Sequence, residues 1–167
     1  MGALDWFKSN DHDDVGATEE VRLRDTMGML RTTIAIENPL QPGVRHELPD
    51  TIVDTGAELS WAPRSVLEQL GITPRKRIRF EMANGMEIVR DIGFAIVHVG
   101  GTVTNDEVVF GEPDDLVLLG ARSLQGLNLK VDLVQKRLVA GGPMLAASGQ
   151  RDPDGMRALM EWRAVAA

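Results

Sequence analysis

The chain has 167 residues, 43% of them apolar and 26% charged, which is the composition of a folded globular protein rather than a disordered one. It contains no cysteine, so disulfide bonds, thiolate catalysis and zinc–cysteine sites are excluded. A net charge of -7 argues against a general nucleic-acid binder, because phosphate contacts need clustered Lys and Arg.

The first segment, residues 1–26, is polar and acidic and shows no sustained hydrophobic period. It predicts an irregular lead-in, with the ordered domain beginning near Met27. The run Asp11-His12-Asp13-Asp14 is better explained as a solvated tail than as a metal site, and we expect neither a metal nor another cofactor. Residues 1–10 lack the apolar stretch of a signal peptide, and no stretch approaches 18 apolar residues. We therefore expect a cytoplasmic protein with no membrane partner.

The first half of the domain reads as a hairpin followed by a short helix. Residues 30–36 alternate in character and predict a strand, and a Pro- and Gly-rich turn separates them from a second strand at residues 44–53. Pro63 suits the first turn of a helix that runs to Leu70 and ends at Gly71.

The second half, from Arg77 to Phe110, has an all-β pattern. Asn84-Gly85 between alternating strands predicts a hairpin with a type I′ turn, in which both central residues have positive φ. Gly100-Gly101 predicts a second hairpin. The basic cluster at residues 75–79 is interpreted as the solvated edge of a sheet, since charges protect edge strands.

The last part of the domain predicts a return to the core and a closing pair of strands. Apolar residues 116–119 re-enter the core, a short helix is expected at 121–126, and strands at 129–132 and 137–140. The predicted domain thus spans residues 27–142. Residues 143–167 form a tail, with a helical pattern at Met156 to Val165.

The most informative local pattern is Asp54-Thr55-Gly56-Ala57 at the end of the second strand. A strand that leads an Asp into a turn of small residues presents a carboxylate at the floor of a cleft. Asp and Gly are also ordinary turn residues, so the four residues alone do not separate a catalytic loop from a simple turn.

With Leu118-Leu119-Gly120 downstream, the pattern resembles the aspartic peptidases of the retropepsin type, clan AA. The resemblance spans residues 28–140, and its final strands resemble the bacterial single-domain members. It implies an all-β fold, a closed β-barrel or sandwich with short helices and a flap hairpin, and one catalytic lobe per chain.

The resemblance also assigns roles to single residues. The catalytic residues are Asp54, Thr55 and Gly56, with the Thr55 hydroxyl expected to tie two catalytic loops together. The implied substrate-binding residues, from the loop, the pocket wall and the flap, are Ala57, Glu58, Trp61, Ala83, Asn84, Gly85 and Met86. Trp61 is larger than the aliphatic residue usual in the family, and the flap carries little glycine.

Two carboxylates that share one proton can supply both the base and the acid that amide hydrolysis needs. This chain has one Asp-Thr-Gly and no internal repeat, so the second carboxylate must come from another copy. The expected function is therefore an aspartic endopeptidase that acts as a homodimer on peptides or unfolded proteins. The alternatives are a non-catalytic module of the same fold that binds peptides or dimerises, and a structural β-domain that dimerises through its tail.

Overall fold

The computed structural model describes residues 20–144, and β-strands dominate it. Two short helices are present, α1 (Arg64–Gln69) and α2 (Ala121–Gly126). The strands are β1 (Val21–Arg22), β2 (Arg24–Thr26), β3 (Met29–Glu37), β4 (Arg45–Val53), β5 (Ser60–Pro63), β6 (Lys76–Glu81), β7 (Glu87–Val99), β8 (Thr102–Gly111), β9 (Leu118–Leu119), β10 (Leu129–Asp132) and β11 (Arg137–Ala140). The predicted all-β class with short helices is confirmed.

The larger sheet closes on itself. Its strand order is β2-β3-β4-β9-β5-β8-β7-β6, and an additional antiparallel pairing joins β3 to β7. Six of the strands, from β3 round to β7, therefore form a closed barrel. Closure leaves few unpaired strand edges, which is how a β-protein avoids edge-to-edge association.

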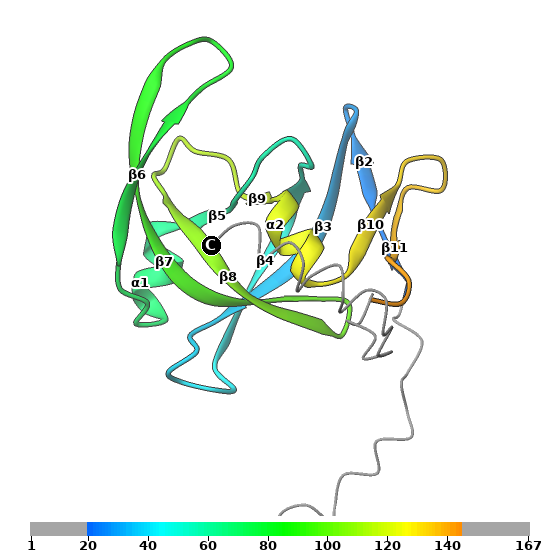
Figure 1. Cartoon of the computed structure of the whole chain (residues 1–167), viewed down its shortest axis with the longest axis horizontal. Helices are drawn as coiled ribbons and strands as arrows, with labels where there is room; N and C mark the ends of the chain where they lie inside the picture. Colours follow the sequence, from blue (N-terminus) through cyan, green and yellow to red (C-terminus); the bar gives the residue numbers. More distant parts are fainter. Residues whose placement is uncertain (1–19, 145–167) are drawn as a thin grey trace, which may run out of the picture.

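The edges that remain lie on opposite sides of the molecule. The β6–β7 hairpin projects beyond the barrel on one side, and the β2–β3 hairpin and the small β1-β11-β10 sheet lie on the other (Figure 1). The edge strand β6 carries the basic cluster, whose charges pair with acids: Lys76 with Glu107, Arg77 with Asp91 and Arg79 with Glu87. The interpretation of this cluster as a charged sheet edge is confirmed.

The core fills the barrel and extends under the helices. Alternate residues of β3 and β7 point inward, so Ile34, Ile36, Val97 and Val99 are nearly inaccessible to solvent. Leu67 of α1 and Leu124 of α2 belong to the same cluster, which shows why each short helix is held in place despite its length.

Both predicted hairpins of the central β region are present, but one uses a different turn from the one expected. At Asn84-Gly85 only Gly85 has positive φ, at 80°, and its N–H donates to the Met82 carbonyl at 2.8 Å. The Asn84 side chain instead accepts the Met86 N–H at 3.0 Å, which stabilises a longer turn. The predicted type I′ turn is therefore wrong here. Gly100 and Gly101, with φ of 53° and 81°, supply the two positive φ values at the other hairpin.

The start of the ordered structure and one strand differ from the sequence prediction, and two predicted features lie outside the described residues. Strands β1 and β2 fall within the segment expected to be irregular, so ordered structure begins before Met27. Strand β5 was not predicted. The helix expected at Met156 to Val165 lies outside the described residues, as does the run at residues 11–14.

Within residues 20–144, neither helix has the length and apolar character needed to cross a membrane.

Candidate active site

The predicted catalytic loop follows β4 directly and is held by its own backbone. The Asp54 N–H donates to the Leu119 carbonyl at 3.0 Å, which continues the parallel pairing of β4 with β9. The Gly56 N–H donates to Asp54 Oδ1 at 2.9 Å, and the Ala57 N–H to the Asp54 carbonyl at 3.3 Å. The strand end and the turn therefore fix the half-buried Asp54 carboxylate in one orientation.

The loop rests on Gly120, at the junction of β9 and α2. A Cβ at Gly120 would lie 2.5 Å from the carbonyl carbon and oxygen of Leu59 and 3.0 Å from the Ala57 oxygen. The following residues continue the contact, with the Ala121 N–H donating to the Ala57 carbonyl at 2.8 Å. Only glycine fits at this close approach, which explains the Leu-Leu-Gly pattern physically.

A buried polar network supports the same junction from below. Ser60 Oγ accepts the Gly120 N–H at 2.9 Å and shares a hydrogen bond of 2.6 Å with Ser123 Oγ. Ser123 in turn donates to Asp106 at 2.8 Å, and Arg122 lies 3.5 Å from the same carboxylate. Each buried polar group has a partner, so the network fixes β5, β8, β9 and α2 relative to one another.

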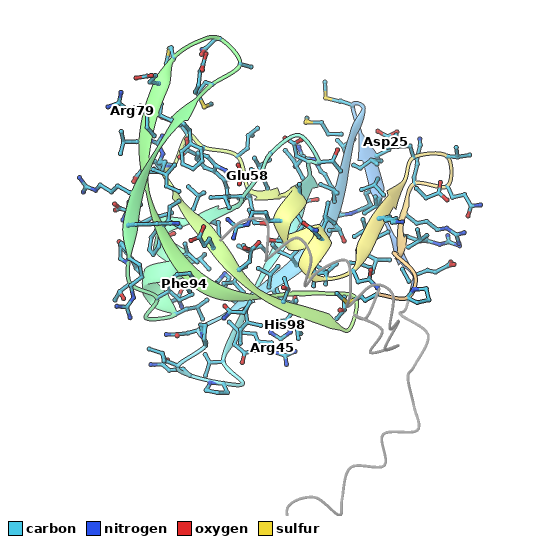
Figure 2. The ribbon with its side chains drawn as sticks, viewed as in Figure 1. Asp25, Arg45, Glu58, Arg79, Phe94 and His98 are labelled. Carbon is cyan, nitrogen blue, oxygen red and sulfur yellow. The ribbon has the colours of Figure 1, made fainter. Side chains whose placement is uncertain are left out.

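A cleft of about 600 Å³ opens beside the loop. Its floor combines the loop with an apolar wall in which the rings of Trp61 and Phe80 lie 5.0 Å apart between centroids. The lining comprises Asp54, Gly56, Ala57, Glu58, Leu59, Trp61, Phe80, Glu81, Met82, Ala83, Asp114, Asp115, Leu116 and Leu118. Glu58 lies near the middle of the molecule, between the projecting β6–β7 hairpin and the opposite side (Figure 2). The aromatic wall suits an extended chain that carries apolar side chains.

Acidic groups dominate the charge of this cleft. Five carboxylates line it, and no Lys or Arg of the described chain does. Asp115 alone among the five is neutralised by a two-bond ion pair, at 2.6 and 2.9 Å, with Arg90. Hydrogen bonding from Arg90 is the main reason that the pKa of Asp115 lies below its ordinary value of 3.8.

Six of the predicted site residues line the cleft: Asp54, Gly56, Ala57, Glu58, Trp61 and Ala83. Thr55 is exposed on the other side of the loop. Asn84, Gly85 and Met86 are exposed at the tip of the β6–β7 hairpin and do not line the cleft in this conformation. The structure thus brings the loop and the pocket wall together but leaves the hairpin tip apart from them.

A second hollow, of about 490 Å³, lies on the Thr55 side of the loop. We call it the Thr55 groove. Its lining is mostly apolar and comprises Leu30, Val53, Thr55, Ala121, Leu124, Gln125, Asn128, Leu129, Lys130, Val131, Leu133 and Gly141. The loop of Asp54 and Thr55 therefore separates an acidic cleft from an apolar groove.

Several lining residues were not identified from the sequence. Phe80 and Glu81 end β6, and Asp114 lies in the turn between β8 and β9. The alternation of Ile78, Phe80 and Met82 places Phe80 on the apolar face of its strand, but no local signal shows that this face meets the Asp54 loop. Within residues 20–144, no group of three or more His, Asp or Glu side chains is arranged to hold a metal ion.

Comparison with known proteins places this geometry in context. Residues 46–126 match the model of a family described as "gag-polyprotein putative aspartyl protease". The comparison with curated proteins gives no significant match. Among solved structures, the chain is similar to the Simian Foamy Virus (mac) protease, with a TM-score of 0.39 and 21% identity over 56% of this chain and 92% of that chain. The matched residues 46–126 contain the Asp54 loop, the β6–β7 hairpin and α2.

Proposed function

We propose that the chain is half of a dimeric aspartic endopeptidase, in which Asp54 and Asp54 of a second copy activate water for peptide-bond hydrolysis. The observation that carries this proposal is the position of Asp54. Its carboxylate is held by the Gly56 amide at the end of a strand, at the floor of a cleft with an aromatic wall.

The chemistry follows from two carboxylates that cannot both be ionised when they are in contact, so the pair holds one proton. The ionised member takes a proton from water while the water oxygen bonds to the substrate carbonyl carbon, and the protonated member gives its proton to the carbonyl oxygen. The tetrahedral species then collapses as its C–N bond breaks: the carboxyl group that took a proton from water gives it to the leaving nitrogen, and the other carboxylate takes back a proton from a hydroxyl of the tetrahedral species.

Both the sequence of the chain and its surface support the requirement for a second copy. One Asp-Thr-Gly supplies one dyad carboxylate, and a two-fold axis beside the loop would supply the other. Thr55 is exposed on that side and lines the apolar Thr55 groove, which a second copy would cover. We assign to the Thr55 hydroxyl a hydrogen bond between the two loops.

The remaining predicted roles complete the proposal. Gly56, Ala57, Glu58 and Trp61 contact the substrate, and the β6–β7 hairpin closes over it so that Ala83, Asn84, Gly85 and Met86 reach it. The likeness to bacterial single-domain members and the cytoplasmic location stay predictions from the sequence.

The test compares cleavage of an unstructured protein by the full chain and by its Asp54→Asn variant. The variant is nearly isosteric but has no acid–base function, so activity should fall on the order of a thousandfold while folding is retained. Asp50→Asn makes the same change four residues earlier, outside the cleft, and should leave activity near that of the unmodified chain. A pepstatin-type inhibitor should block the unmodified chain.

Near-normal cleavage by purified Asp54→Asn would refute the mechanism. Binding of peptides without any cleavage, by either form, would instead identify the non-catalytic module.

A further inference from the structure

The outer part of the cleft holds two acids that have no structural partner within residues 20–144. Glu81 ends β6, Asp114 lies in the β8–β9 turn, and both are exposed and line the cleft. Neither forms an ion pair or a side-chain hydrogen bond with another described residue, although most acids around them do. Their charge is therefore available to a molecule in the cleft.

The nearby cations of the described chain are already paired with other acids. Arg90 binds Asp115, and Arg79 binds Glu87 at 3.1 Å. Arg79 lies on the outer side of the β6–β7 hairpin (Figure 2). The cleft is consequently acidic because its cations are used elsewhere, and no basic side chain on this part of the chain enters to neutralise it.

Glu58 differs from these two acids. The pKa of Arg122 is raised, mainly by its hydrogen bond to Glu107 and in smaller part by the charges of Asp106 and Glu58. Glu58 lies on the loop, and Arg122 is bonded to Glu107 and Asp106 rather than to Glu58. Glu81 and Asp114 are the acids of the cleft that lie away from the loop and have no ion pair among the described residues.

The apolar surface between the acids limits what can bind. Trp61, Phe80 and Leu118 line the same cleft, so an occupant must combine apolar and cationic surface. Lys and Arg do this within one side chain, because the methylene stem can lie on an aromatic wall while the charged end reaches a carboxylate.

We infer that this cleft selects peptides in which Lys or Arg lies next to an apolar residue, with Glu81 and Asp114 as the residues that determine this preference. The inference rests on the proposed function for the location of the substrate. It goes further because it names the chemical class of the substrate and the two side chains that recognise it.

The test measures binding rather than cleavage, with the full-length Asp54→Asn variant. Three fluorescent peptides share an apolar centre and differ only in flanking residues, which are Lys, Gln or Glu. At low salt the Kd of the Lys peptide should be about tenfold lower than that of the Glu peptide, because exposed ion pairs contribute modestly and two acids act together. The difference should shrink as salt is added.

Variants of the two acids, made in the Asp54→Asn background, test which residues cause the preference for the Lys peptide. Glu81→Gln and Asp114→Asn should each reduce the preference about threefold, and the double variant should nearly remove it. Glu47→Gln removes one exposed charge from β4, outside the cleft, and should leave the preference unchanged.

Each outcome decides one of the two claims. Equal binding of all three peptides, or a preference that survives the double variant, overturns the inference and leaves the proposed function standing. No binding of any peptide overturns the inference and counts against the peptide cleft of the proposed function as well.

Discussion

The two hollows beside the Asp54 loop differ in chemistry although they share one wall. The cleft holds five carboxylates and an aromatic wall, whereas Lys130 is the only ionisable side chain among residues 20–144 that lines the Thr55 groove. A charged cleft can stay open to water and admit a solute, while an apolar groove is stabilised when another apolar surface covers it. The loop thus has one face suited to a substrate and one suited to a partner.

The largest effect should come from Gly120→Ala, which disturbs the support of both faces. The added Cβ would lie 2.5 Å from the Leu59 backbone, which cannot move away without displacing the loop. We expect a loss of about 3 kcal/mol in the free energy of unfolding, measured by chemical denaturation. At Gly111 the nearest atom to an added Cβ is 3.2 Å away, so Gly111→Ala should cost less. Equal stability of Gly120→Ala and the unmodified chain would show that the loop does not rest on this position.

Placing a charge in the groove should affect association and spare the cleft. Leu133 lines the Thr55 groove and is 72% exposed, so Leu133→Asp should be tolerated by the monomer. Burial of an unpaired carboxylate under a second copy should raise the dimer Kd on the order of a hundredfold, as measured by sedimentation. Val134 is 92% exposed and does not line the groove, so Val134→Asp is the matched control. If both variants associate equally well, the groove is not the interface.

Thr55→Ala should weaken the dimer less, about tenfold in Kd, because it removes a hydrogen bond without adding a charge. Thr55→Ser keeps the hydroxyl and should behave almost like the unmodified chain. Peptide affinity of each single cleft should change little. A dimerisation constant that is the same for the Ala and Ser variants would show that this hydroxyl does not join the two loops.

The smallest effect concerns two neighbouring acids of the cleft, Asp114 and Asp115. The pKa of Asp115 is lowered in the folded chain, so its ion pair with Arg90 contributes stability above the ordinary value of 3.8. That contribution is lost as pH falls through the lower pKa of the folded state.

Asp115→Asn should therefore lower the thermal midpoint at neutral pH, by an amount equivalent to about 1 kcal/mol, and the gap should be smaller at a pH below 3.8. Asp114→Asn, without an ion pair among the described residues, should leave the midpoint unchanged at both pH values. A gap for Asp115→Asn that is constant with pH would mean that its carboxylate does not stabilise the fold through its charge.

The sequence predicts much of the fold because the residues that mark turns and the ends of strands and helices are clear. The bounds of α2, β10 and β11 agree with the prediction to the residue, since glycines mark both ends of α2 and follow β11. Strand β5 was missed because Ser60–Pro63 is short, ends in Pro, and is buried at three successive residues, so it shows no alternation. Strands β1 and β2 have polar sequences, and only their pairing with β11 and β3 makes them strands.

The candidate site likewise has a part that can be predicted from the sequence and a part that cannot. Residues 54–58 are contiguous, and their turn chemistry can be read locally. Glu81 and Asp114 reach the cleft only because β6 and the β8–β9 turn are brought beside the loop by the closed barrel. No local pattern encodes that meeting, so the acidic character of the cleft could not be predicted from the sequence.

The position of β9 in the sheet has a consequence for how the chain folds during synthesis. β4 and β5 are consecutive along the sequence, yet β9, which is synthesised two hairpins later, lies between them in the sheet. Contacts so distant in sequence form slowly, because a long loop must close before they contribute. During translation, the Asp54 loop has no β9 to pair with and no Gly120 to rest on until residues 118–126 have left the ribosome. We therefore expect the nascent chain to gain the geometry of the Asp54 loop in one of the last steps of folding.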